Sequence, residues 1–159
     1  MIPLKDDVPS RTTPLVTLAL IGVNVAVFLY QASLQMGADP GSQRAAEDFI
    51  REFGLIPCRL SGDCRVPLDV PQPIVTVFTS MFLHGGVLHV GGNMLYLWIF
   101  GDNVEDTLGH VRFALLYLGS GVGAALAQTL VNPAAGVPMV GASGAVSGVL
   151  GAYLLLFPY

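Results

Sequence analysis

The sequence predicts an all-α protein, a polytopic bundle of transmembrane helices, and three observations lead to this prediction. The chain of 159 residues is 53% hydrophobic and only 11% charged, whereas an ordinary soluble domain carries about 25% charged residues. Its mean hydropathy is +0.65. Residues 12–38, 70–101 and 113–159 contain no Asp, Glu, Lys or Arg. A soluble core of this size would leave too little polar surface to cover so much apolar area.

Four membrane spans are expected within the charge-free stretches. A membrane helix needs about 20 apolar residues, and the third stretch is long enough for two spans separated by the turn residues Asn132, Pro133, Gly136 and Pro138. The expected spans are residues 14–33, 86–102, 112–131 and 141–158. A cleaved signal peptide is the alternative for the first span, but that apolar run is long for a signal peptide.

A long polar connection, residues 35–72, separates the first two spans. Its residues 43–53 alternate charged and apolar side chains, which predicts a short amphipathic helix at the membrane interface. Cys58 and Cys64 lie in the same connection. They are expected either to form a disulfide, if this loop faces an oxidising compartment, or to remain as two free thiols.

Polar residues inside apolar spans are costly unless paired, and they are therefore candidates for function. The second span contains His89 and Asn93, which are four positions apart and share one face of a helix, and His84 comes just before the span. Gly91 and Gly92 leave the backbone beside this face open to a neighbouring helix.

The fourth span begins with small residues, among which Ser143 lies near the expected start of the helix. Free backbone N–H groups and the positive end of the helix dipole stabilise negative charge there, which suits a nucleophilic hydroxyl and an oxyanion. The simpler interpretation is helix packing, because Gly144, Gly148 and Ala152 form a stripe of small residues. In that interpretation the Ser143 hydroxyl bonds a backbone carbonyl and His89 bonds a neighbouring helix.

Taken together, these residues resemble the rhomboid family of intramembrane serine proteases. The resemblance covers nearly the whole chain and is strongest over residues 81–93, 101–109 and 141–144. The shared motifs, in chain order, are His84-x4-His89-x3-Asn93, Glu105-x3-Gly109 and Gly141-x-Ser143-Gly144.

The resemblance implies a serine endopeptidase that cleaves transmembrane segments of membrane proteins with a Ser–His dyad. It implies that Ser143 is the nucleophile, that His89 and Asn93 stabilise the oxyanion, and that His84 belongs to the same polar cluster. Glu105 is expected to anchor the turn after the second span. The expected partners are the lipid bilayer and transmembrane protein substrates. Nucleic acid is not expected as a partner, since the net charge is −4 with seven Lys and Arg residues.

The chain also departs from the family pattern. The family core has six helices, of which four spans are expected here, and its general-base histidine follows the nucleophile, whereas His84, His89 and His110 all precede Ser143. We therefore expect an incomplete rhomboid-like domain that is inactive by itself. Ser147 stands where the family often has an aromatic residue.

The family implies a multi-pass protein of the bacterial inner membrane with its amino terminus in the cytosol. Charge alone leaves this topology open, because basic residues occur in both sets of loops. No cofactor, metal or nucleotide motif is recognised, and the expected chemistry needs none. The alternative function is a non-catalytic rhomboid-like module that binds membrane helices.

Overall fold

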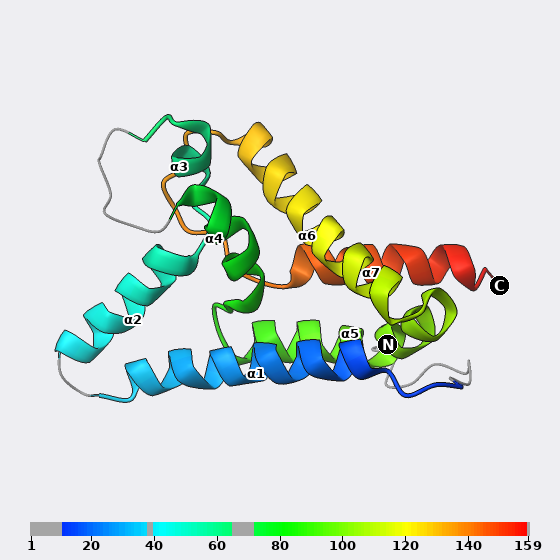
Figure 1. Cartoon of the computed structure of the whole chain (residues 1–159). Helices are drawn as coiled ribbons and strands as arrows, with labels where there is room; N and C mark the ends of the chain where they lie inside the picture. The colour runs from blue at the N-terminus through cyan, green and yellow to red at the C-terminus, as the bar shows by residue number, and fades with distance from the viewer. Residues whose placement is uncertain (1–10, 38–39, 65–71, 159) are drawn as a thin grey trace.

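The computed structural model describes residues 11–37, 40–64 and 72–158. Apart from one isolated β-bridge, the regular structure within these ranges is helical, as the sequence predicts. Figure 1 shows the arrangement. The elements, in chain order, are α1 (Leu15–Gln35), α2 (Pro40–Phe53), α3 (Pro57–Ser61), α4 (Pro73–Thr79), the 3-10 turn η1 (Ser80–Phe82), α5 (Val87–Leu108), α6 (His110–Val131) and α7 (Ser143–Leu156).

Among the described helices, α1 and α6 are each long and apolar enough to cross a membrane. A third candidate combines α4 and η1 with α5 and is bent by 81° at residues 83–86. Helix α7 is apolar but has only 14 residues, and such a helix is about 21 Å long, less than the roughly 30 Å of a bilayer's hydrocarbon core. By length and composition, the described helices form a membrane bundle with two or three spans, fewer than the four that the sequence predicts.

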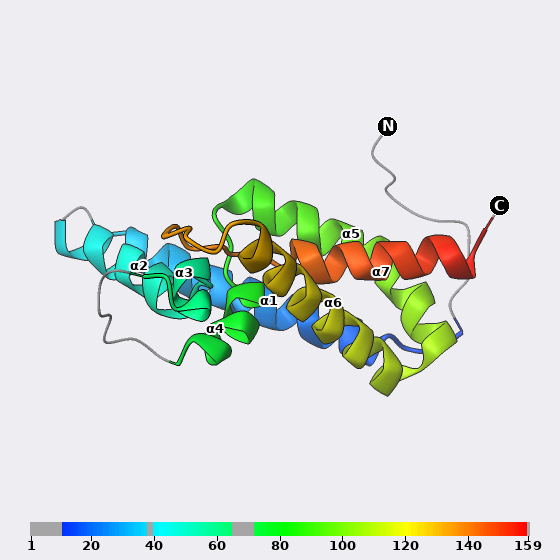
Figure 2. The same cartoon turned by 90° about the horizontal axis from the view of Figure 1, so that it is seen from above.

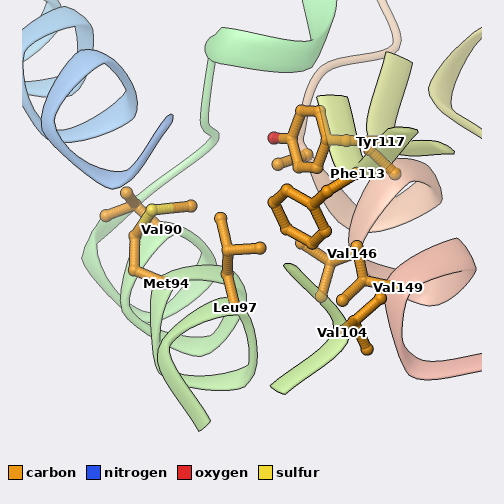
Figure 3. Packing of buried hydrophobic residues seen from close by; sticks show 10 residues of the cluster. Val90, Met94, Leu97, Val104, Phe113, Tyr117, Val146 and Val149 are labelled. Carbon is orange, nitrogen blue, oxygen red and sulfur yellow. The ribbon is translucent and has the colours of Figure 1, made fainter. Parts of the chain in front are cut away.

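The core of the bundle lies between α5, α6 and α7 (Figure 3). Helix α7 packs against both α6 and α5, and α5 also packs against α1 (Figures 1 and 2). The large buried members are Leu97, Phe113, Tyr117, Val104 and Val149. Many apolar side chains elsewhere point outward, among them Leu88 and Leu155, which are 93% and 83% exposed. An apolar exterior around a packed interior is what a lipid environment favours.

Small residues bring α6 and α7 into close contact. A Cβ built on Gly144 would collide with Ala124, and one built on Gly148 would collide with Ser120. The predicted stripe of small residues on α7 thus serves helix packing, because it lets the two backbones approach each other.

Glu105 joins the ends of three helices. Its carboxylate accepts hydrogen bonds from the backbone N–H groups of Val16 and Thr17, at 2.8 and 2.7 Å, and from the Thr17 hydroxyl at 2.7 Å. It also contacts Nδ1 of His110 at 2.5 Å. Glu105 therefore supplies the N-terminal cap that α1 lacks in its own sequence, since Pro14 makes no side-chain cap.

Helix α5 continues to Leu108, beyond the expected end of the span at residue 102. The acidic residues after 102 suggest a loop, but Glu105 binds the start of α1 and Asp106 binds the residues just before α1. Asp106 accepts hydrogen bonds from the backbone N–H groups of Arg11 and Thr12, next to the Glu105 contacts. These bonds replace water as partners of the carboxylates, so the helix can extend through an acidic sequence.

The long connection folds back onto the loop between α6 and α7. Its residues 43–53 are helical within α2, as their amphipathic pattern predicts, and Cys58 and Cys64 form a disulfide. Leu55 pairs with Met139 in the isolated β-bridge. Residues 38–39 and 65–71 of the expected connection lie outside the described residues.

Candidate active site

The loop that carries His84 is held by a side chain from α1. The Nε2 group of Gln31 donates a hydrogen bond to the backbone carbonyl of His84 at 3.2 Å, and the His84 backbone N–H donates to Oε1 of Gln31 at 3.0 Å. Both residues are buried, with 3% and 2% of their surface exposed. The Gln31 amide thus pairs with the backbone as a second strand would, and it fixes the loop where the chain turns into α5.

His84, His89 and Asn93 form one polar cluster at the start of α5. The imidazole rings of His84 and His89 have centroids 5.1 Å apart and meet edge to face. The amide nitrogen Nδ2 of Asn93 lies 3.1 Å from Nε2 of His84. An amide nitrogen is a donor, so Nε2 accepts and the proton of a neutral His84 ring lies on Nδ1. That Nδ1 atom is buried and has no hydrogen-bond partner in the part of the chain that the structure describes.

His89 lies against the residues that lead into α7. A Cβ built on Gly141 would lie 2.7 Å from Nε2 of His89 and 3.7 Å from Oγ of Ser143. The imidazole and the hydroxyl therefore face the same small space, which stays open because residue 141 has no side chain. Gly141 also has φ +126°, a backbone conformation that other residues rarely adopt. Both constraints require glycine two residues before Ser143.

The hydrogen bonding of His89 decides which of its nitrogens carries a proton. The backbone N–H of Gly85 donates to Nδ1 of His89 at 3.4 Å. A neutral imidazole that accepts at Nδ1 is protonated at Nε2. The nitrogen beside Gly141 and Ser143 is then a hydrogen-bond donor, which is the property needed to stabilise an oxyanion.

Ser143 is the first residue of α7, and its side chain is exposed. The loop before it is fixed by a hydrogen bond from the Gly141 backbone N–H to the Ser80 carbonyl at 2.9 Å. At a helix start the first backbone N–H groups have no partner within the helix. An accessible hydroxyl thus lies beside free N–H groups and the imidazole of His89.

The structure brings His84, His89 and Asn93 together, and it brings His89 to Ser143 through Gly141. Asn93 reaches this group through its contact with His84. Sequence reasoning missed Gln31 and the Ser80 carbonyl. Gln31 is a polar residue at the end of an apolar stretch, and that feature is the signal that identifies it. The contact at Ser80 uses only its backbone carbonyl, so the side chain of residue 80 gives no indication of this hydrogen bond.

The remaining histidine lies away from this cluster. His110 begins α6, and its ring contacts Glu105 at the other end of α5. Within residues 11–37, 40–64 and 72–158, no group of three His, Cys, Asp or Glu side chains could hold a metal ion.

Comparisons with known proteins agree on one family. A family model described as Rhomboid domain matches residues 71–159. RHOMBOID-like protein 1 of Arabidopsis thaliana is 50% identical over 78 residues, which is 49% of this chain and 20% of that protein. Rhomboid protein 1, mitochondrial, of Saccharomyces cerevisiae is 34% identical over 146 residues, 89% of this chain and 36% of that protein. Rhomboid protease GluP of Bacillus subtilis is 41% identical over 78 residues, 49% of this chain and 15% of that protein.

The chain thus spans between 15% and 36% of the length of these three relatives. Similar proteins also include Inactive rhomboid protein 1 of Drosophila melanogaster. The names of the relatives therefore include both a protease and an inactive protein. No solved structure matches the chain at a significant level. The matched region contains α4 to α7, and with them His84, His89, Asn93 and Ser143. The chain is therefore a membrane protein that belongs to the rhomboid family, a family of intramembrane proteases that also has inactive members.

Proposed function

We propose that this chain is part of an intramembrane serine endopeptidase that cleaves transmembrane segments of other membrane proteins, with Ser143 as its nucleophile. The observation that carries the proposal is the approach of His89 Nε2 to Gly141, two residues before Ser143. Membership of a family that contains named proteases supports the reaction class. The position of Ser143 at the start of α7 supports its role, because that position is open and rich in donors.

In the proposed reaction the Ser143 Oγ attacks the carbonyl carbon of the scissile peptide bond, and its proton passes to a general base. The negative charge that develops on the carbonyl oxygen is stabilised by three donors: His89 Nε2–H, the amide of Asn93 and the backbone N–H of Ser143. The C–N bond then breaks, the amine leaves with the proton, and water hydrolyses the acyl-enzyme. Donors of this kind each contribute about 10²–10³ in rate.

The general base of the proposed Ser–His dyad is a histidine outside residues 1–159. His89 is unsuited to the role, since the nitrogen near Ser143 carries the proton. His110 is bound to Glu105. Ser143, Ser147 and Gly151 lie on one exposed face of α7, which leaves room for a further element to carry the base. The 159 residues alone are then expected to be inactive.

The active-site end of the bundle is proposed to face the outside of a bacterial inner membrane, with the amino terminus in the cytosol. The Cys58–Cys64 disulfide supports this orientation, because disulfides persist in oxidising compartments and are rare in the cytosol. The disulfide-bonded segment contacts the loop before Ser143, whereas the start of α1 lies with Glu105 at the opposite end of α5.

Labelling of the full-length protein in membranes with a serine-directed fluorophosphonate tests the nucleophile. The matched variants are Ser143→Ala and Ser147→Ala, since both serines are exposed and lie one turn apart on α7. We expect the wild type and Ser147→Ala to label and Ser143→Ala not to label. Equal labelling of Ser143→Ala and the wild type would refute the assignment.

A non-catalytic module that binds membrane helices is the second candidate function, because a protein named as an inactive rhomboid is among the relatives. Such a module would use the polar residues of α5 and α7 to line a binding surface. Substrate that is captured by full-length wild-type protein but never cleaved, with no labelling at Ser143, would favour this function.

A further inference from the structure

We propose that residues 54–64, of which residues 58–64 are closed by the Cys58–Cys64 disulfide, are a positioning element that holds the loop before Ser143 in its reactive geometry. We call residues 54–64 the docking segment and residues 132–142 the serine loop. The proposal rests on the proposed function of Ser143 and adds a dependence of that site on the disulfide. In this proposal the docking segment acts on Ser143 only through the serine loop.

The docking segment and the serine loop are joined by backbone hydrogen bonds. Leu55 and Met139 exchange two of them, with N···O distances of 3.1 and 2.7 Å, and the Cys58 N–H donates to the Ala135 carbonyl at 3.1 Å. Leu55 is fully buried and Cys58 is 6% exposed. Buried backbone hydrogen bonds of this kind hold the two segments in one register.

Packing and a side-chain bond add to these contacts. The Ser61 hydroxyl donates to the Pro133 carbonyl at 2.9 Å. A Cβ built on Gly54 would lie 3.1 Å from Cβ of Pro138 and 3.3 Å from Cγ1 of Val140, so the loop lies directly over this glycine. The docking segment therefore touches the serine loop from residue 133 to residue 140, up to the residue before Gly141.

The disulfide keeps the docking segment in the shape that makes these contacts. It joins Cys58 to Cys64 around a turn in which the Cys64 N–H also donates to the Cys58 carbonyl at 3.0 Å. Cys58 and Ser61, the two residues that bond residues 133 and 135, both lie inside this closed turn. Opening the turn raises the conformational entropy of the segment, which weakens its hold on the serine loop.

Opening the disulfide is a two-electron reduction. A dithiol such as dithiothreitol supplies two electrons and two protons, the S–S bond breaks to give two thiols, and the dithiol closes to its own disulfide. Ser143 and the donors His89 and Asn93 keep their chemistry in this step. Any change in the reactivity of Ser143 would then come from the position of the serine loop.

Hydrogen exchange of the full-length protein in lipid nanodiscs, with and without the disulfide, tests the proposal. We expect the Cys58→Ser/Cys64→Ser variant to exchange amides in residues 132–142 about tenfold faster than the wild type, while Val16 and Thr17 stay unchanged. Dithiothreitol should reproduce the change in the wild type and add nothing in the variant. Ser61→Ala, which removes one contact and keeps the disulfide, should give a smaller change in the same residues.

The rate of fluorophosphonate labelling completes the test. We expect the maximal labelling rate at Ser143 to fall several-fold without the disulfide, while the probe concentration for half-maximal rate stays the same, since no binding group is lost. Unchanged exchange in residues 132–142 would overturn the proposal, as would faster exchange with an unchanged maximal rate. If Ser143 labels in none of the proteins, the proposed function fails, and the exchange data still decide whether the docking segment holds the loop.

Discussion

The two ends of α5 use polar side chains in opposite ways. At its C-terminal end, the Glu105 carboxylate receives four contacts of 2.8 Å or less and is 1% exposed. At its N-terminal end, the bond from Gly85 to His89 is 3.4 Å long, and Nδ1 of His84 is buried without a partner among the described residues. A satisfied buried carboxylate stabilises the fold, whereas a buried donor without a partner costs free energy. We propose that this difference separates a structural end from a functional end.

The largest expected effect on the comparison comes from His89→Ala at the functional end. Removing the Nε2–H donor near Ser143 should lower cleavage and labelling by the full-length protein by about 10²–10³. His110→Ala is the matched control at the structural end, because His110 contacts Glu105 and lies away from Ser143. Thermal unfolding in detergent should shift for His110→Ala more than for His89→Ala. Equal losses of rate in the two variants would contradict the division into two ends.

Glu105→Gln should cost about 3 kcal/mol in the free energy of unfolding, because the charged acceptor of the α1 amides is lost. Unfolding of the full-length protein in mixed detergent micelles measures the change. The neighbouring Asp106→Asn is the control. Asp106 binds Arg11 and Thr12 where the bonds are exposed, so its replacement should cost less stability than that of Glu105. A larger cost for Asp106→Asn than for Glu105→Gln would contradict the claim that Glu105 is the main carboxylate that stabilises the start of α1.

Gln31→Ala should have an intermediate effect, about 2 kcal/mol in stability, since two buried hydrogen bonds to the His84 backbone are lost. Because this loop positions the polar cluster, labelling of Ser143 should also slow. Gln31→Glu keeps the acceptor for the His84 N–H but loses the donor to its carbonyl. The rate of Ser143 labelling and the free energy of unfolding should both be higher for the wild type than for either variant. Normal labelling of a destabilised Gln31→Ala protein would show that Gln31 serves the fold alone.

Gly148→Ala should affect stability but not the polar cluster, at a cost of about 1–3 kcal/mol in the free energy of unfolding, because its new Cβ would collide with the Ser120 side chain. The double variant Gly148→Ala/Ser120→Gly removes that collision and should recover most of the loss. Unfolding in detergent checks both proteins. Additive losses in the double variant would mean that the α6–α7 contact is not the cause.

Much of the fold follows from hydropathy alone, and the parts that do not follow have physical reasons. The charge-free stretches predict apolar helices where α1, α5, α6 and α7 lie, since apolar helices are what a bilayer selects. Helix α7, with 14 residues, is shorter than the expected fourth span. Hydropathy does not predict the extension of α5 to Leu108, because this part of the helix is stabilised by the distant amides of α1. The local sequence of α5 does not indicate that contact. The Leu55–Met139 bridge is missed because backbone pairing at long range leaves no residue pattern.

The candidate site is predicted better than its support. His84, His89, Asn93 and Ser143 stand out because polar residues are costly in an apolar helix, and the structure gathers the three α5-side residues into one cluster beside Gly141. Their supports are a backbone carbonyl, a glutamine at the end of α1 and a disulfide-closed loop. Gln31 and the two cysteines stand out in the sequence, but their partners do not, because each contact is made with the backbone of a distant segment.

The most direct test of the central claim is to map the fluorophosphonate adduct on the full-length protein by peptide mass spectrometry. The account predicts a single phosphonylated serine, Ser143, in the peptide that contains the start of α7. An adduct on Ser147 or on a serine elsewhere, with Ser143 unmodified, would contradict the claim that the N-terminal end of α5 and the start of α7 form the active site.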